Sequence, residues 1–362
     1  MQRFFKIHIF CLLFHCGVSF ANTTILLTGA AGFIGSNFLH YMFNKYEGYR
    51  FLVLDALTYA GNLDNIPDYI KNSGRFEFFH GSVTNASLVD FLMQQSDMVV
   101  HFAAESHVTN SIYEDVIFFE TDVNGTRVLM RSLVKHRTVQ RFIHISTSEV
   151  YGTAEAIPMD EFHPLNPRSP YAAAKTGADR LVYAYYCTYD IPALIIRPFN
   201  NYGPNQHVEK LIPRFITNAL TGKKLAVEGD GLQIRDWVHT EDTCRAIDLA
   251  LHCPNFDQIK GQAINIGTGK GISVLEIANK IVNLMNLPAD TIEFVRDRPG
   301  QVDCHIASAD KALRLLGWQA TRDFDAELSN LIQWYAMHRR HWENNIVSTD
   351  FLDKKYRRSR TY

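Results

Sequence analysis

Two residues four positions apart, Tyr171 and Lys175, have side chains suited to acid–base chemistry. On a helix, positions i and i+4 lie on one face, so these side chains would be neighbours. An ammonium group beside a phenol lowers the pKa of the phenol, and Tyr171 could then act as a base near neutral pH. The spacing is common by chance, so this interpretation depends on the motifs around it.

A second polar cluster follows the apolar segment 141–145. It consists of Ser146, Thr147, Ser148 and Glu149. Three hydroxyl groups and a carboxylate are unfavourable in an apolar core, and they lie where a predicted strand ends. We therefore expect Thr147, Ser148 and Glu149 to form a catalytic site together with the tyrosine and the lysine.

A glycine-rich loop spans residues 29–35, between a predicted strand at 24–28 and a predicted helix that reaches about residue 46. Gly29 and Gly32 permit a tight turn and a close approach of the backbone to a pyrophosphate, while Gly35 lets the helix pack on the strand. The N-terminus of the helix presents free N–H groups and a positive dipole end to the phosphates. The loop predicts a dinucleotide site.

An acidic residue follows at the spacing that such a site requires. Asp55 ends the next apolar strand, 20 residues beyond Gly35, where a carboxylate accepts hydrogen bonds from an adenosine ribose. A carboxylate repels a 2′-phosphate, and Ala56 and Leu57 supply no arginine to hold one. The sequence therefore favours NAD over NADP.

These motifs need a scaffold, and the apolar runs predict one. Short apolar runs separated by helix-length stretches are typical of an α/β fold with a doubly wound parallel sheet. After Arg197 the pattern changes at the turn cluster 200–204, and helices mix with short strands. We expect a smaller C-terminal lobe that binds substrate at the carboxyl edge of the sheet. The runs expected to form the sheet are 24–28, 51–54, 76–79, 98–102, 141–145 and 193–196.

Composition excludes several other classes of protein. The 362 residues are 46% hydrophobic and 20% charged, with a net charge of −2, so nothing favours a disordered chain or nucleic-acid binding. The six cysteines are scattered without a CxxC pair, and no spacing suits a metal site.

The chain divides into four predicted parts. Residues 1–22 resemble a signal peptide or form an unstructured extension, and membrane contact is expected only through residues 1–21. Residues 23–197 form the NAD-binding domain and residues 198–340 mainly the substrate lobe. Residues 341–362 are a basic tail.

Taken together, these motifs resemble the extended short-chain dehydrogenase/reductase family, whose dinucleotide-binding domain has the Rossmann fold. Further segments narrow the resemblance to its nucleotide-sugar enzymes of the dTDP-glucose 4,6-dehydratase group. It covers about residues 24–335. The segments that carry it are 54–62, 101–108, 169–171, 200–204, 209–213, 233–237 and 297–300.

The resemblance implies a reaction on a nucleoside-diphosphate hexose, most simply dTDP-glucose or UDP-glucose. The C4 hydroxyl is oxidised, water is lost across C5 and C6, and hydride returns to C6. Tyr171 would act at C4, Glu149 at C5, and Ser148 or a water that it orients at the C6 hydroxyl, while Thr147 would bind the C4 oxygen. NAD would be regenerated at each turnover and stay bound.

The resemblance also implies binding residues. For the cofactor they are Gly29, Gly32, Phe33, Ile34, Gly35, Asp55, Val83, Ala103, Tyr171 and Lys175. For the substrate they are Thr147, Asn200, Lys210, Leu211, Arg235, Asn265 and Arg298.

One departure from the pattern affects the predicted chemistry. The dTDP-glucose enzymes typically have an aspartate, which protonates the departing C6 hydroxyl, where this chain has Ser148. A serine there resembles GDP-mannose 4,6-dehydratases and UDP-glucuronate decarboxylases. The segment 301–305 also departs from the usual sequence. A nucleotide-sugar epimerase, a UDP-glucuronate decarboxylase and a non-catalytic nucleotide-sugar-binding protein therefore remain alternatives.

The family further suggests a homodimer, and the cytosolic cofactor favours a cytoplasmic location over export through the signal-like segment. Helices that begin near Tyr113 and Pro170 would pack across a two-fold axis as a four-helix interface. The residues expected to face the partner are Val128, Leu129, Leu181 and Tyr185.

Overall fold

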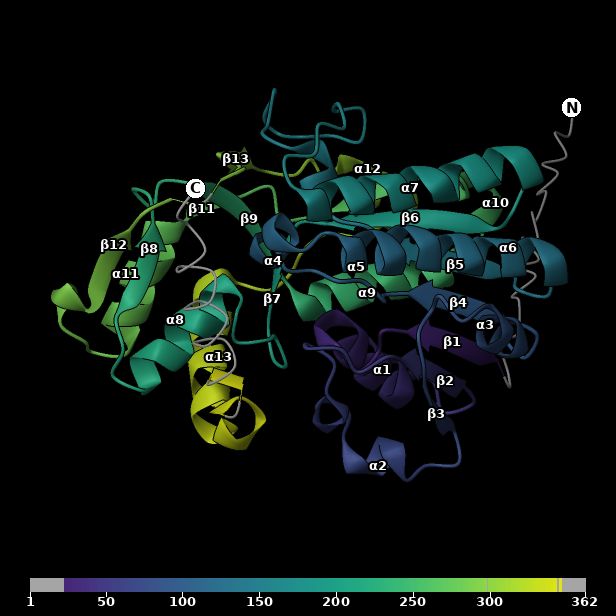
Figure 1. The fold of residues 1–362 in the computed structure, drawn as a ribbon, viewed down its shortest axis with the longest axis horizontal. Coiled ribbons are helices and arrows are strands. Elements are labelled where there is room, and N and C mark those ends of the chain that lie inside the picture. The colour runs from purple at the N-terminus through teal and green to yellow at the C-terminus, as the bar shows by residue number, and fades with distance from the viewer. Residues whose placement is uncertain (1–22, 298, 344, 347–362) are drawn as a thin grey trace, which may run out of the picture.

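The computed structural model describes residues 23–297, 299–343 and 345–346, and Figure 1 shows their arrangement. The signal-like segment 1–22 and the basic tail beyond residue 346 lie outside the described residues. Among the described residues, no helix has both the length and the apolar character that crossing a bilayer requires.

A seven-stranded sheet forms the centre of the larger domain. All of its strand pairs are parallel, and the order β3-β2-β1-β4-β5-β6-β10 runs outward in both directions from the β1–β4 pair. This confirms the doubly wound sheet predicted from the apolar runs. The strands are β1 (Thr24–Thr28), β2 (Arg50–Asp55), β3 (Phe76–His80), β4 (Met98–His101), β5 (Arg141–Ile145), β6 (Ala193–Pro198) and β10 (Ala263–Ile266).

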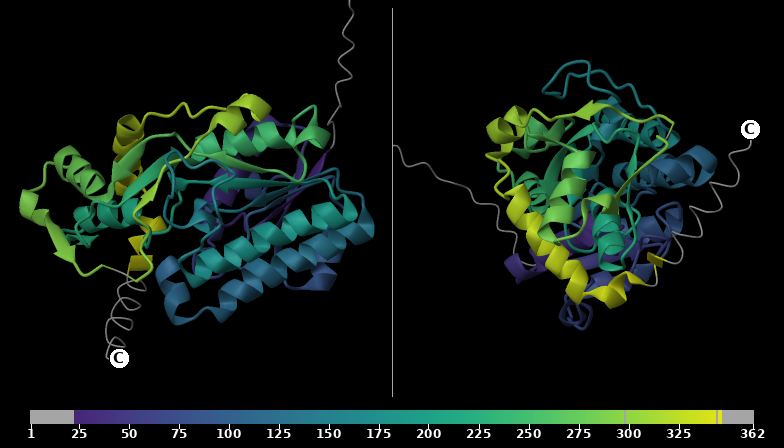
Figure 2. Two further views of the ribbon diagram at one scale, coloured as in Figure 1. Left: turned by 90° about the horizontal axis from the view of Figure 1, so that it is seen from above. Right: turned by 90° about the vertical axis from the view of Figure 1, so that its left-hand side faces the viewer.

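Helices cover both faces of this sheet. One face carries α1 (Phe33–Lys45), α9 (Thr240–Leu251), α10 (Phe256–Ile259) and α12 (Asp310–Leu316). The other carries α3 (Ala86–Met93), α6 (Thr126–His136) and α7 (Pro170–Tyr189), and α6 and α7 lie side by side in Figure 2.

Burial explains why the strands are almost continuously apolar. Successive residues of β1 enter different cores: Ile25 and Leu27 pack under α1 and α9, whereas Leu26 packs under α3 and α6. A strand that is buried on both faces cannot alternate polar and apolar residues. The edge strand β3 is less buried and carries exposed Glu77.

The smaller lobe has its own core and lies to the left in Figure 1. Its short strands pair as β11-β9-β13, with β7 on β9, and as β12-β8. The strands are β7 (Asn200–Tyr202), β8 (Leu225–Glu228), β9 (Ile234–His239), β11 (Gly271–Ser273), β12 (Ile292–Val295) and β13 (Cys304–His305). The helices are α8 (Leu211–Leu220), α11 (Val274–Leu284) and α13 (Phe324–Met337).

Short helical segments complete the connections. They are η1 (Leu63–Asn65), α2 (Asp68–Lys71), α4 (Val108–Tyr113), α5 (Val116–Phe118), the π-helix η2 (Phe119–Gly125), η3 (Ser148–Tyr151), η4 (Ala289–Thr291) and η5 (Arg339–His341).

The structure differs from the predicted boundary at residue 197. The chain enters the lobe after β6 but returns to the large domain, where α9 packs on the sheet and β10 adds its seventh strand beside β6. The boundary therefore does not separate the two parts in space. The run at β10 was missed because its four residues resemble the short strands of the lobe.

The prediction that Val128 and Leu129 face a partner subunit was wrong. Both side chains are buried within the chain itself, in the core between the sheet and α3, α6 and α7. They belong to the buried side of α6, which packs on the sheet.

A buried ion pair fixes α7 against the sheet. The Arg197 guanidinium on β6 donates to both carboxylate oxygens of Asp179 on α7, at 2.8 and 2.9 Å, and both side chains are buried. Ser146, at the end of β5, donates to the same carboxylate at 2.8 Å. Burial raises the pKa of Asp179, but the hydrogen bonds and charge of Arg197 outweigh it and hold that pKa well below its usual range.

We expect Asp179→Asn to lower the free energy of unfolding by about 3–5 kcal/mol, because Arg197 would stay buried with an uncompensated charge. Urea denaturation of the purified chain measures this. Asp190→Asn is the control, because Asp190 pairs with Lys260 at the surface with its side chain 74% exposed, and exposed pairs contribute little. Equal losses in the two variants would contradict a structural role for the buried pair.

Candidate active site

The polar cluster lies at the carboxyl edge of the sheet, directly after β5. The Thr147 hydroxyl accepts a hydrogen bond from the Glu149 N–H at 3.2 Å and begins the turn η3. Gly152 ends the turn with φ +70°, and a Cβ there would lie 2.0 Å from the Asn166 carbonyl oxygen. The turn therefore holds Ser148 and Glu149 close to the end of the strand.

The predicted tyrosine–lysine pair lies on the first two turns of α7. The Ser169 hydroxyl caps this helix by accepting from the Ala172 N–H at 3.1 Å. Tyr171 and Lys175 are both buried, and the Lys175 ammonium donates to the Ile145 carbonyl at 2.7 Å. The helix thus brings the pair beside the end of β5, as the sequence predicted.

The electrostatics differ from the expectation that Lys175 lowers the pKa of Tyr171. Burial is the largest influence and raises that pKa, the nearby carboxylates of Asp122 and Glu149 raise it further, and a hydrogen bond with Thr147 acts in the opposite direction. The prediction was wrong because it weighed the ammonium without the desolvation that accompanies it.

Asp122, which the sequence analysis missed, is the acidic partner of Lys175. Burial raises the pKa of Asp122 to about 7, although the charge of Lys175 and the Glu105 N–H, which donates at 2.9 Å, both lower it. Burial in turn lowers the pKa of Lys175, and the carboxylates of Asp122 and Asp179 oppose that shift. Among the described residues, Asp122 Oδ2 has no hydrogen-bond partner, which leaves a buried acceptor near the lysine.

The glycine loop has the geometry of a dinucleotide site. Gly29 has φ +73°, and a Cβ on it would lie 2.5 Å from the Ala103 nitrogen, so only glycine fits. A Cβ on Gly35 would lie 2.5 Å from the Gly29 carbonyl oxygen. The helix α1 begins directly after Gly32, with Phe33 and Ile34 half-buried in its first turn.

Asp55 connects β2 to this loop. Its carboxylate accepts from the Ala31 N–H at 2.9 Å and the Leu57 N–H at 2.8 Å. Each carboxylate oxygen keeps a second acceptor site for a ribose hydroxyl. Val83 is buried and packs against Gly125 of η2. These residues and Ala103 fit the dinucleotide that the sequence predicts.

The predicted substrate residues come from several elements. Lys210 caps α8 and donates to the Ser106 carbonyl at 2.6 Å, with Leu211 next to it. Arg235 on β9 is 6% exposed and donates to the Ile234 carbonyl at 2.9 Å and to Gln301 at 3.4 Å. Asn200 on β7 is half-buried, and β7 pairs with β9. Arg298 lies outside the described residues.

Asn265 is the predicted substrate residue that the structure contradicts. It lies on β10, is fully buried, and uses its amide within the fold: its oxygen accepts from the Tyr151 hydroxyl at 2.7 Å and its nitrogen donates to the Met159 carbonyl at 3.1 Å. These two hydrogen bonds connect β10 to η3 and to the segment that follows η3.

His305 on β13 is a further residue that the sequence analysis missed. Its Nδ1 lies 3.4 Å from Ser148 Oγ and 4.0 Å from Glu149 Oε1. Its Nε2 lies 2.6 Å from the Gly152 carbonyl oxygen. The available signal was the unusual segment 301–305, but nothing in it indicated contact with a turn more than 150 positions earlier.

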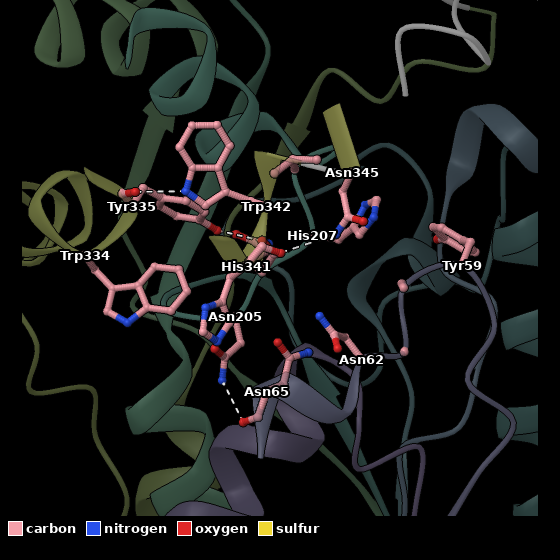
Figure 3. Close-up of a pocket in the computed structure, with 14 residues that line it drawn as sticks. Tyr59, Asn62, Asn65, Asn205, His207, Trp334, Tyr335, His341, Trp342 and Asn345 are labelled. Carbon is pink, nitrogen blue, oxygen red and sulfur yellow. Dashed lines mark hydrogen bonds between the residues drawn. The ribbon is translucent and has the colours of Figure 1, made fainter. Parts of the chain in front are cut away.

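A cavity of about 260 Å³ lies between residues 59–65, which follow β2, and the end of α13 with the residues after it (Figure 3). Aromatic side chains of α13 and the residues after it face carboxamides such as Asn62 and Asn65. The Asn65 amide donates to the Ala31 carbonyl of the glycine loop at 2.8 Å. Tyr171, Lys175 and Glu149 are not among its lining residues, so we treat it as separate from the catalytic cluster.

Comparison with known proteins gives a consistent set of matches. The family model described as GDP-mannose 4,6 dehydratase matches residues 26–331. The low-salt glycan biosynthesis protein Agl12 of Haloferax volcanii is 42% identical over 311 residues, which cover 86% of this chain and 98% of that protein.

Two further proteins have names that state an activity. The trifunctional UDP-glucose 4,6-dehydratase/UDP-4-keto-6-deoxy-D-glucose 3,5-epimerase/UDP-4-keto-L-rhamnose-reductase RHM3 of Arabidopsis thaliana is 37% identical over 324 residues, covering 88% of this chain and 48% of that protein. The crystal structure of DesIV, a dTDP-glucose 4,6-dehydratase from Streptomyces venezuelae with NAD and TYD bound, matches with a TM-score of 0.85 and 38% identity. That match covers 89% of this chain and 100% of DesIV.

Proposed function

The chain belongs to the GDP-mannose 4,6-dehydratase family, and we propose that it is an NAD-dependent nucleotide-sugar 4,6-dehydratase, a hydro-lyase. The observation that carries this proposal is the gathering of Thr147, Glu149 and Tyr171 at one edge of the sheet, with Lys175 beneath them. A 4-epimerase needs the tyrosine and the cofactor, but its reaction does not remove the C5 proton, so it gives Glu149 no role.

The residues have separate roles in this chemistry. The C5 proton of a hexose is removed readily only after C4 has become a ketone. Tyr171 takes the proton of the C4 hydroxyl while Thr147 binds the C4 oxygen, and Glu149 then takes the proton from C5. The chemistry that NAD would supply when bound is to accept a hydride from C4 and to return it to C6, so the cofactor would be regenerated and would stay bound.

The cofactor would be held by the glycine loop and its neighbours. Backbone N–H groups at the start of α1 would face the pyrophosphate, and Asp55 would accept from the adenosine ribose. Asp55 disfavours the 2′-phosphate of NADP. We propose a cytoplasmic location because this cofactor is cytosolic.

The substrate that we propose is dTDP-glucose or UDP-glucose. DesIV and the Arabidopsis relative support these two sugars by name. The ammonium of Lys210 and the guanidinium of Arg235 are suited to a diphosphate, and Arg235 could bind it in bidentate fashion. The neighbouring Asp236 carboxylate accepts hydrogen bonds from Thr268, Gly269 and Ala307.

A product assay tests the proposed activity. Purified protein with NAD should convert dTDP-glucose or UDP-glucose to a 4-keto-6-deoxy sugar, which absorbs near-ultraviolet light in alkali. GDP- and CDP-sugars are assayed alongside. An epimerised or decarboxylated sugar would support the alternative enzymes, and binding without turnover would support a non-catalytic binding protein.

Two substitutions should separate the oxidation from the elimination. Tyr171→Phe should give no reduced nicotinamide absorbance when substrate is added. Glu149→Gln should give that absorbance and then stall at the 4-keto hexose, with turnover lower by on the order of 10²–10⁴-fold, because the amide cannot accept a proton. Exchange of solvent deuterium into C5 should be lost in both variants.

The control for these variants is Glu155→Gln, which changes an exposed glutamate that bonds Asn166. It should behave as the unaltered protein. Release of 4-keto-6-deoxy product by Glu149→Gln at a normal rate would exclude Glu149 as the base. Failure of that variant to reduce the cofactor would move Glu149 to the first oxidation or to binding.

We further propose a homodimer through a four-helix interface, with contact residues that differ from Val128 and Leu129. Exposed apolar side chains lie on α5, η2 and α7, which pack against one another. They include Val116 (67% exposed), Ile117, Phe119 and Tyr183. Leu181 and Tyr185 of α7 are half-buried beside them.

The protein should have twice the chain mass by light scattering at micromolar concentration. The double substitution Val116→Lys and Ile117→Asp should shift it toward the chain mass, because it places charges in an apolar contact. Phe162→Ser, at an exposed phenylalanine outside these helices, is the control. A monomeric unaltered protein would refute this interface.

A further inference from the structure

The elimination step needs a proton for the departing C6 hydroxyl, and Ser148 is a weak source. An isolated alcohol holds its proton far more tightly than a carboxylic acid does. Ser148 is also buried, with 2% of its surface exposed, so solvent does not easily replace a proton that it gives away. A neighbouring group must therefore supply it with protons.

His305 is placed to do this. A carbonyl oxygen can only accept, so the 2.6 Å contact with the Gly152 carbonyl fixes a hydrogen on His305 Nε2. In the neutral ring, Nδ1 is then unprotonated. That nitrogen faces both Ser148 Oγ at 3.4 Å and Glu149 Oε1 at 4.0 Å.

We propose that His305 is a positioning residue that carries a proton from Glu149 to Ser148. Glu149 takes this proton from C5, and His305 returns it to Ser148, which then protonates the leaving hydroxyl. This inference rests on the proposed dehydratase function. In this proposal, Ser148 and His305 together replace the carboxylic acid that the dTDP-glucose enzymes typically have at the position of Ser148.

The proton balance closes within the site. Glu149 takes the C5 proton, and the C5–H electron pair forms the C5=C6 double bond as the C6–O bond breaks. The C6 oxygen leaves as water with the Ser148 proton. Nδ1 receives the proton from the Glu149 carboxyl and passes it to Ser148 Oγ, so the serine, the histidine and the glutamate carboxylate are all restored. No oxidant or reductant is consumed in this step.

The surroundings of the ring suit a group that holds a proton briefly. His305 is fully buried, and burial is the main cause of its lowered pKa. Glu149 favours the protonated ring, while the charges of Arg235 and His163 oppose it. In the tautomer that the Gly152 contact fixes, Nδ1 can accept the proton that the Glu149 carboxyl gives up.

The fold keeps the ring in place. His305 is aligned with Arg235 in the β13–β9 pairing, and its Nε2 is anchored on the positive-φ glycine that ends η3. The strand and the turn thus fix the ring between the two groups that it would connect.

The test uses two leaving groups. dTDP-glucose and UDP-glucose lose hydroxide, which must be protonated, whereas their 6-deoxy-6-fluoro analogues lose fluoride, which need not be. His305→Gln keeps an N–H for the Gly152 carbonyl but has no titratable nitrogen. We expect it to reduce turnover of the hydroxyl substrate by on the order of 10²–10⁴-fold and to leave fluoride release within a fewfold of normal.

Variants at the two neighbours complete the comparison. Ser148→Ala should show the same selective loss, and Glu149→Gln should lose both reactions. His163→Gln is the matched control, because His163 is a nearby buried histidine whose Nε2 accepts from the Glu155 N–H and whose Nδ1 lies 2.9 Å from the Pro164 carbonyl oxygen. It should retain both reactions. If His305→Gln does not fold, His305→Asn is measured in the same way.

The outcomes separate the two hypotheses. Equal loss of both reactions in a folded His305 variant would overturn the relay and leave a structural role. Normal turnover of the hydroxyl substrate would overturn it as well. If the unaltered protein forms no 4-keto-6-deoxy sugar, the proposed function fails, irrespective of the variants.

Discussion

The contact on which the site depends is the buried pair between Asp179 and Arg197. It joins the middle of α7 to β6, and the hydroxyl of Ser146 brings the end of β5 into the same network. The catalytic tyrosine and lysine stand on α7, and the hydroxyl and carboxylate groups follow β5. One charged contact therefore sets the distance between the two halves of the site. A helix held by apolar packing alone could slide along the sheet at little cost, whereas a bidentate pair has one register.

The same network contributes to the electrostatics of the site. Lys175 is buried between the carboxylates of Asp122 and Asp179, and it donates to the backbone of β5. Desolvation dominates the pKa of Tyr171. The nearby carboxylates of Asp122 and Glu149 raise that pKa further, and the hydrogen bond with Thr147 opposes them.

The sequence predicted the features that depend on local order. The glycine loop, the run of the first six strands and the Tyr171–Lys175 spacing each follow from neighbours in the chain, and parallel topology brings the strand ends to one edge. The missed features depend on distant pairings. β10 joins β6 across the lobe, Asn265 is held by Tyr151, and His305 meets a turn more than 150 residues away. The burial that reversed the pKa expectation for Tyr171 is likewise a property of the assembled fold.

The presence of Ser148 and the presence of His305 can be explained together by the proton chemistry of the site. A carboxylate at position 148 would stand beside Glu149, and two close carboxylates raise each other's pKa, so that one of them is held as the acid. With Ser148 this repulsion is absent, but the proton that such a pair of carboxylates would store is absent too. A titratable ring at position 305 restores a proton carrier without restoring the negative charge. Because its Nδ1 faces both Ser148 and Glu149, acid and base are linked by one group and need no separate protonation before each turnover.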